Sequence, residues 1–158
     1  MSYTVQKRQL PAQLMAYGEA AATVAEVPDV LAEIFPRVMR HVQAEDGQVA
    51  GPPFAYYKTM GEPMQLQAGI PIDEPIPEGD GVGVGELPGG SVLVTVHIGP
   101  YDQLNDAYDA LMAFADEHEL TPVGTVWESY WTDPASEPDP DNWKTEVFMP
   151  LASSGPGS

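Results

Sequence analysis

Gly51-Pro52-Pro53-Phe54-Ala55-Tyr56-Tyr57 and Gly124-Thr125-Val126-Trp127-Glu128-Ser129-Tyr130 are two copies of one short pattern, 73 positions apart. A glycine opens both copies and a tyrosine closes both. The same separation relates four positions further upstream, which are Leu31, Phe35, Val38 and Met39 in the first copy and Leu104, Tyr108, Leu111 and Met112 in the second. Matches that keep one order and one spacing predict an internal duplication.

The duplication extends to both ends of the chain with small changes in spacing. Val5 and Leu10-Pro11 recur 77 positions later, and Ile70-Pro71-Ile72 recurs 79 positions later as Met149-Pro150-Leu151. We therefore expect one domain over residues 1–151, with repeat one at about 3–72, repeat two at about 82–151, and a flexible tail at 152–158. Two copies are too few for an open solenoid, so they are expected to pack as a pseudo-twofold pair.

Each copy is predicted to contain one amphipathic helix. In the first copy apolar residues recur at helical spacing through residues 30–42, with Pro28 in the first turn and Pro36 expected to kink the helix. The second helix is expected to run from Asp102, as the N-cap, to about His118. The outer face of the first helix is expected to carry Glu33, Arg37 and Arg40.

Strand-like segments flank each helix. Residues 91–98 are rich in β-branched side chains and end at Gly99-Pro100. Each copy closes with two such segments joined by a turn, at Gly61-Glu62 and at residues 133–142, which predicts two hairpins. Residues 73–90 are expected to be the linker and the entry to the second copy. One helix and three or four antiparallel strands per copy give an α+β fold of two β-α-β-β repeats.

Composition and charge exclude several classes of protein. The chain has 24 acidic residues against 6 Lys and Arg, a net charge of −18, so it lacks the cationic surface that nucleic-acid binding uses. No apolar run approaches the roughly 20 residues of a membrane-spanning helix, and the N-terminus lacks the apolar region of a signal peptide. We therefore expect a cytoplasmic protein that binds neither membrane nor, by this chain alone, nucleic acid.

Three candidate binding motifs are rejected because the residues around them do not match the known motif. Glycines at 79, 81, 83 and 85 resemble a phosphate-binding loop, but Glu86-Leu87-Pro88 follows in place of a helix, so a flexible turn is predicted. The acidic loop 133–142 lacks the spacing and the turning glycine of a calcium loop. The histidines lack metal-ligand spacing and are interpreted as structural or surface residues; they are His41, His97 and His118. We expect no metal and no cofactor.

Glu128 breaks the symmetry of the duplication. On a strand over residues 126–132, Glu128 and Tyr130 share one face, because side chains two apart point to the same side. Their counterparts are Ala55 and Tyr57, so the tyrosines match while a carboxylate replaces an alanine. The alternative is an exposed acid on a strand, but few neighbours of Glu128 are hydrophilic. We predict that Glu128 serves a ligand or a reaction.

Aromatic residues complete this candidate ligand site. The predicted ligand contacts are Glu128, Tyr130, Tyr57, Trp131, Tyr101, Tyr108 and Phe148. Ordinary core packing is an equal alternative for Tyr57, Tyr101 and Tyr108. Trp127, Trp131, Phe54 and Tyr56 are expected to supply aromatic surface on the other side of their strands.

Four segments together resemble the GyrI-like family, and the resemblance covers about Tyr3 to Leu151. The segments are 51–57, 97–101, 127–130 and 143–150. This family is the effector-binding domain of multidrug-responsive transcription activators and also occurs alone. The resemblance implies two modules around a ligand channel, in which the glutamate matched by Glu128 meets cationic aromatic compounds. It also implies that a role in regulation would need a separate partner chain.

Two functions follow from these residues. A buried carboxylate with aromatic walls suits a lipophilic cation, through charge pairing and attraction to ring faces, and this favours a stand-alone small-molecule-binding protein. Some stand-alone members that are similar in sequence hydrolyse strained cyclopropane-bearing electrophiles. In that alternative Glu128 is catalytic, because desolvation raises a carboxyl pKa toward neutrality. Binding asks less of the sequence, since no second catalytic group is placed.

Overall fold

The computed structural model describes residues 3–58, 64–79, 81–87, 89–100, 103–123, 125–132 and 137–152. These residues form two α-helices and eight strands, and the strand pairs within each compact unit are antiparallel, which confirms the α+β class. The chain divides into a first unit, residues 11–89, and a second unit, residues 1–10 with 90–158. Each unit holds one α-helix and four strands. The sequence predicted three or four strands per copy.

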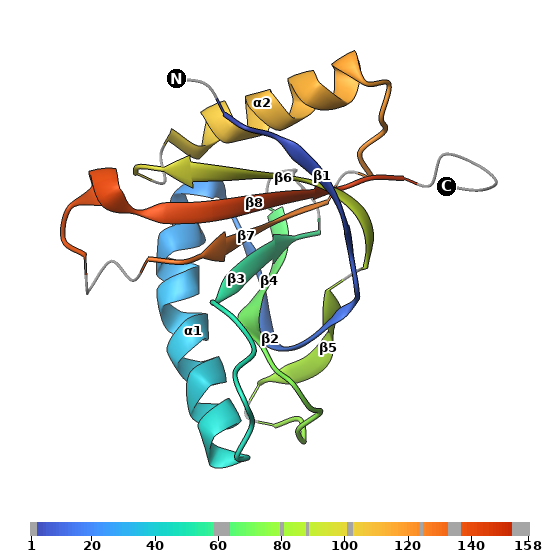
Figure 1. Cartoon of the computed structure of the whole chain (residues 1–158). Coiled ribbons are helices and arrows are strands. Elements are labelled where there is room, and N and C mark those ends of the chain that lie inside the picture. Colours follow the sequence, from blue (N-terminus) through green and yellow to red (C-terminus); the bar gives the residue numbers. More distant parts are fainter. Residues whose placement is uncertain are drawn as a thin grey trace. The chain divides into compact units, whose positions relative to one another are not determined.

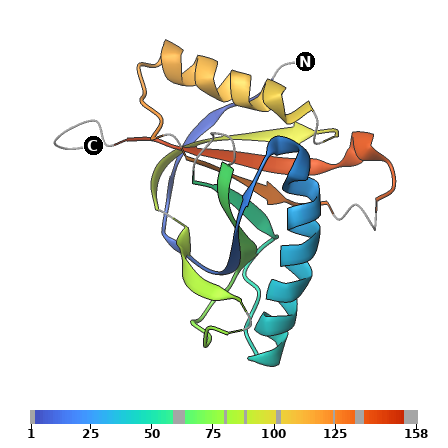
Figure 2. The ribbon, with the colours of Figure 1, turned by 180° about the vertical axis from the view of Figure 1, so that it is seen from behind.

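The first unit is a four-stranded antiparallel sheet with one helix. Its strands pair in the order β3-β4-β2-β5, and α1 packs on β2 and β4 (Figures 1 and 2). The bounds are β2 Gln13–Ala22, η1 Val24–Glu26, α1 Val27–Ala44, β3 Phe54–Tyr57, β4 Met64–Pro71 and β5 Gly83–Leu87.

The apolar stripe of α1 forms as the helical spacing predicts. Ile34, Val38 and Val42 are at most 1% exposed, while Pro36 lies inside the helix with its side chain exposed. Arg37 differs from its expected place on the outer face. It lies against Gly18 of β2, where a Cβ atom would come within 2.7 Å of the Arg37 guanidinium. The missing side chain of Gly18 makes the room.

Part of the expected linker is a strand. β5 occupies the second half of the glycine-rich segment and pairs with β2, so the prediction of a flexible turn was wrong for Gly83 and Gly85. A Cβ atom at Gly83 would lie 3.0 Å from Tyr17, and one at Gly85 would lie 3.3 Å from it. The alternate glycines let the Tyr17 ring lie against β5, a tertiary contact that local composition does not reveal.

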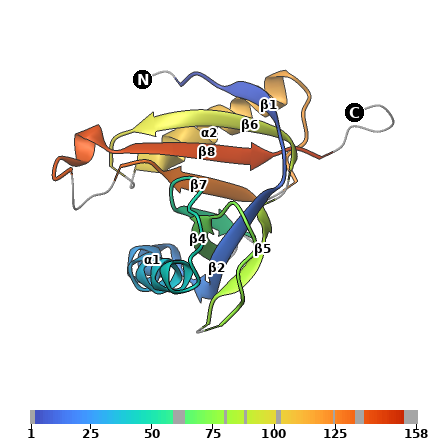
Figure 3. The same cartoon turned by 60° about the horizontal axis from the view of Figure 1, so that its bottom comes forward.

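The second unit has the same number of strands and one helix. Figure 3 shows its strands in the order β1-β6-β8-β7. The helix α2 packs on β6 and β8 (Figures 1 and 2), and Ala107 and Ala115 in its buried stripe let it approach closely. The bounds are β1 Gln6–Leu10, β6 Gly90–Ile98, α2 Leu104–Glu117, β7 Val126–Tyr130, η3 Pro140–Asn142 and β8 Lys144–Pro150.

Several predicted boundaries are met and one is not. β6 ends at Ile98, just before Gly99, whose φ of 140° suits glycine. β7 and β8 form the expected hairpin. The N-cap of α2 is Gln103, without a side-chain cap, instead of Asp102. Asp102, Gly61-Glu62 and residues 153–158 of the tail lie outside the described residues. The repeat bounds and the pseudo-twofold relation stay predictions.

In the described part of the chain, no helix combines the length and apolarity needed to cross a bilayer.

Candidate functional site

Glu128 lies in the middle of β7 on the face of the sheet that α2 covers. It pairs with Val147 of β8, and Tyr130 pairs with Thr145. The hydroxyl of Tyr108, from α2, donates to Glu128 Oε2, which places the carboxylate on the helix side of the sheet. Only 5% of Glu128 is exposed. The alternative of an exposed strand acid is therefore wrong.

Two phenols hold the carboxylate. Tyr130 donates to Oε1 at 2.7 Å, and Tyr108 donates to Oε2. Burial raises the pKa of the Glu128 carboxyl, and the hydrogen bonds from Tyr108 and Tyr130 and the charge of nearby His97 lower it in part. Both hydroxyls are neutral donors, so they stabilise the carboxylate without neutralising it.

Further polar residues share this face of the second unit. Paired residues of neighbouring strands point to the same side, and β6 pairs His97 with Thr145 and Thr95 with Val147. His97 is 2% exposed; its Nε2 lies 3.0 Å from the Pro100 carbonyl oxygen and its Nδ1 lies 2.9 Å from the Tyr3 hydroxyl. We call this set the polar cluster, defined as Thr95, His97, Tyr108, Glu128, Tyr130 and Thr145.

The first unit provides an internal comparison. A Cβ atom at Gly18 would lie 3.0 Å from Ile34 of α1, so Gly18 faces α1. Gly18 pairs with Ala68, and Ala68 pairs with Ala55, which puts Ala55 on the α1 face of its sheet. Ala55 and Glu128 therefore occupy corresponding places under the helices of their own units. The predicted break in symmetry falls on a buried face.

The structure brings together three of the seven predicted ligand contacts, namely Glu128, Tyr130 and Tyr108. Phe148 lies on the opposite face of the sheet, where it stacks on Trp127 with ring centroids 5.0 Å apart. Trp131 is 52% exposed and its indole N–H donates to Glu146. Glu146 lies between Thr145 and Val147 on β8, so its side chain points to the face opposite Glu128. Tyr57 is buried in the first unit. Tyr101 lies outside the described residues.

Residues missed by the sequence reasoning are Tyr3, Thr95, His97 and Thr145. His97 was interpreted only as a structural or surface histidine; it is buried beside the candidate site. A signal was present, because the spacings of 77 and 79 positions align His97 with Ala20 and Thr145 with Leu66. Each pair repeats the change from apolar to polar that singled out Glu128.

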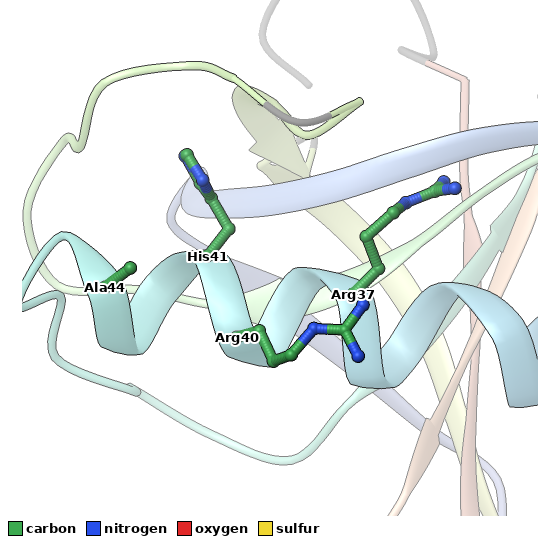
Figure 4. A pocket seen from close by; sticks show the side chains of 4 residues that line it. All are labelled: Arg37, Arg40, His41 and Ala44. Atoms are coloured by element: carbon green, nitrogen blue, oxygen red, sulfur yellow. The ribbon is translucent and has the colours of Figure 1, made fainter.

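A separate cavity of about 460 Å³ lies along α1 in the first unit (Figure 4). Arg37, Arg40, His41 and Ala44 line it. The Nε2 atom of His41 lies 2.6 Å from the Pro77 carbonyl oxygen, and Arg37 pairs with Glu33 at 2.8 Å. Guanidinium groups repel a cation, so this cavity does not suit the cationic ligand expected from the sequence.

A second cavity of about 260 Å³ includes Lys58 and Glu19 in its lining. Neither cavity is lined by Glu128. Among the described residues, no group of three or more His, Asp or Glu side chains could hold a metal ion.

The profile of the GyrI-like small molecule binding domain matches residues 3–152. The chain belongs to the GyrI-like family. The match spans both units, so the small-molecule-binding class applies to the chain as a whole. A search of curated proteins finds no match.

Solved structures share the fold of this GyrI-like chain at low sequence identity. The C-terminal domain of EcmrR has a TM-score of 0.84 and 17% identity, and the match covers 97% of this chain and 99% of that one. In EcmrR bound to DNA the match has a TM-score of 0.82 and 18% identity and covers 96% of this chain but 58% of that one, so a domain of this fold occurs within a longer protein that was solved in complex with DNA.

In two further structures the match covers more than nine tenths of the other chain. A hydrolase from Listeria innocua has a TM-score of 0.62 and 11% identity, with 94% of this chain and 91% of that chain covered. SAV2435, bound to tetraphenylphosphonium, has a TM-score of 0.58 and 11% identity, with 97% and 95% covered. At these identities the likeness concerns the fold.

Proposed function

We propose that this GyrI-like domain binds lipophilic, aromatic cations and that Glu128 is the anchor for the positive charge. The observation that carries the proposal is a buried carboxylate held by two phenols. In the described part of the chain, no Lys or Arg forms an ion pair with Glu128. A buried acid without an ion-pair partner costs several kcal/mol when ionised, and a ligand cation would supply that partner.

The two phenols suit such a ligand. They hold the carboxylate in one orientation, and aromatic ring faces attract cations. Because Glu128 is 95% buried, the cation reaches Oε2 only by displacing the Tyr108 hydroxyl, which is the partner contributed by α2. Tyr130 comes from the same strand as Glu128 and can keep its bond to Oε1.

The comparisons support this choice of ligand class without deciding it. SAV2435, which shares the fold, has a structure bound to tetraphenylphosphonium, a lipophilic aromatic cation. The net charge of −18 also favours the approach of cations. We propose that the protein acts in the cytoplasm. Where its ligand binding controls transcription, we propose that DNA contacts come from a partner regulator chain.

Calorimetric titration with tetraphenylphosphonium tests the proposal. Glu128→Gln keeps the shape and removes the charge, so affinity should fall by about 1–3 kcal/mol, roughly 5- to 150-fold. Glu146→Gln is the matched control, because Glu146 lies on β8 in the same unit and points to the opposite face. Its affinity should equal that of the wild type. Equal affinities for all three proteins would show that Glu128 is not the anchor.

A hydrolase is the second candidate. Burial raises the pKa of the Glu128 carboxyl, which makes it a better acceptor of protons, and the fold is shared with a protein described as a hydrolase. Glu128 would take a proton from a water molecule as the water oxygen bonds to a strained electrophile. Mass detection of water addition to a cyclopropane-bearing electrophile tests this candidate. Glu128→Gln should abolish turnover while leaving binding of that neutral compound largely intact.

A further inference from the structure

Thr145 is the member of the polar cluster whose hydrogen-bonding capacity is unused. The residue is 0% exposed, and its Oγ1 atom has no hydrogen-bond partner. A buried hydroxyl without a partner loses its bonds to water and gains none in return. The other cluster hydroxyls are paired: Thr95 donates to the Thr4 carbonyl oxygen at 2.9 Å, and Tyr108 and Tyr130 donate to Glu128.

The position of Thr145 relates it to Glu128. Thr145 pairs across the sheet with Tyr130, two residues from Glu128 on β7, and with His97 on β6. A diagonal pair of this kind has Cβ atoms no more than about 7–8 Å apart on one face. A single small molecule can therefore reach both the Glu128 carboxylate and the Thr145 hydroxyl.

The fold does not require a polar residue at this place. In the second unit, Thr145 of β8 pairs with His97 on one neighbouring strand and with Tyr130 on the other. The first unit has the same pairing at the corresponding positions, where Leu66 of β4 pairs with Ala20 and with Tyr57. Five members of the polar cluster have apolar counterparts at the spacings of the duplication. In the order Thr95, His97, Tyr108, Glu128 and Thr145, these counterparts are Gly18, Ala20, Phe35, Ala55 and Leu66.

His97 serves as a fixed neighbour of Thr145. Its two ring nitrogens lie within hydrogen-bond distance of the Tyr3 hydroxyl and the Pro100 carbonyl oxygen. The ring therefore has its polar atoms occupied and its orientation set. Of the three cross-strand neighbours His97, Thr145 and Tyr130, Thr145 is the one with an unpaired hydroxyl, which can donate one hydrogen bond and accept two.

We propose that Thr145 is a ligand-specificity residue, whose hydroxyl bonds a neutral polar group on the same cation that Glu128 anchors. The ligand class is thereby narrowed to aromatic cations that carry a hydroxyl, ether or carbonyl oxygen beside the charged centre. This inference rests on the proposed cation binding at Glu128. Thr145, on the strand next to Glu128, would provide a second contact, a hydrogen bond to an uncharged group of the ligand.

The probes are tetraphenylphosphonium and its three derivatives with one hydroxyl in the ortho, meta or para position of a single ring. Charge and size are nearly constant across the four compounds. Each is titrated into the wild-type protein and into Thr145→Val, which keeps the side-chain shape and removes the hydroxyl. At least one derivative should bind the wild type about 3- to 10-fold more tightly than it binds the variant. Tetraphenylphosphonium itself should bind both proteins equally.

Thr95→Val is the matched control on the same face. Its hydroxyl is already paired with Thr4, so the variant should have a lower midpoint of thermal unfolding and an unchanged order of affinities for the four compounds. Thr145→Val removes an unpaired group and should unfold at the wild-type temperature or above. A lower unfolding temperature, with all four affinities reduced alike, would assign Thr145 a purely structural role and overturn the inference.

The two proposals fail in different ways. If the wild type binds all four cations and no derivative depends on Thr145, the specificity role is wrong while cation binding at Glu128 stands. If the wild type binds none of the four, both are wrong.

Discussion

A buried carboxylate among phenols gives Glu128 properties that its strand neighbours lack. Its hydrogen bonds come from Tyr108 and Tyr130, and its pKa lies above the ordinary value of 4.5 because burial outweighs those bonds. The folded protein therefore keeps a proton on Glu128 at pH values where the unfolded chain has released it. The stability that this protonation contributes is present below about pH 4.5 and is lost as the pH rises through the folded-state pKa.

Glu128→Gln should accordingly stabilise the free protein at neutral pH. Glutamine resembles the protonated acid, so the gain in free energy of unfolding should be about 1–3 kcal/mol at pH 7–8 and near zero below pH 4.5. Urea denaturation of both proteins across this range measures the difference. A difference that did not change with pH would mean that Glu128 ionises as readily in the folded state as in the unfolded chain.

Binding of tetraphenylphosphonium should have the opposite dependence on pH. The cation pairs with the carboxylate, so the affinity of the wild type should rise with pH and level off above the folded-state pKa of Glu128. His97, Tyr108 and Tyr130 are the other titratable groups beside it. Because Glu128→Gln lacks the carboxyl, its profile reports the pH dependence that comes from all groups other than Glu128. Parallel profiles for the two proteins would remove Glu128 from the binding site.

The two helices differ in that α1 contains an internal proline, whose effect on stability can be measured. Pro36 lies inside α1, where it supplies no backbone N–H and its ring crowds the preceding turn. The corresponding residue of α2, 73 positions later, is the exposed Asp109. The buried stripe of Ile34, Val38 and Val42 holds α1 to its sheet, so this helix tolerates the proline.

Pro36→Ala should raise the free energy of unfolding by about 1–3 kcal/mol, because a helix-interior proline costs about 3 kcal/mol relative to alanine. Asp109→Ala is the control at the matching helix position and should change stability by about 0.5 kcal/mol or less. Thermal and urea unfolding of both variants measure the two effects. Destabilisation by Pro36→Ala would show that the packing of α1 depends on a bend at this residue.

On the scale of the whole molecule, charge decides what the chain can approach. Its net charge of −18 opposes contact with the negatively charged phosphates of nucleic acids. Two of its six Lys and Arg residues, Arg37 and Arg40, line the cavity on α1.

The purified chain should therefore show no retardation of duplex DNA near physiological salt, with or without tetraphenylphosphonium. Raising the salt concentration should instead raise its thermal unfolding temperature, because screening weakens repulsion among the acidic residues. Retardation of DNA by the chain alone would show that local basic residues outweigh the net charge.

The sequence alone determined most of the helices and strands and singled out Glu128. Helical spacing located α1 and α2, a run of β-branched residues located β6, and the offsets of the duplication singled out Glu128 as a carboxylate that corresponds to an alanine. Period and spacing are properties of neighbours along the chain. β5 was not located, because its glycines resemble a flexible linker. The GyrI-like family followed from segments that keep their order.

Only the tertiary structure decided which of the candidate residues meet. Strand pairing placed His97 and Thr145 on the face of Glu128 and turned Phe148 away from it, and the packing of α2 brought Tyr108 onto the carboxylate. Burial fixed the state of each polar group, leaving Glu128 with a raised pKa and the Thr145 hydroxyl without a partner. These outcomes depend on register and on contacts between segments far apart in the chain, and the energy of a buried polar group is set by those contacts instead of by its sequence neighbours.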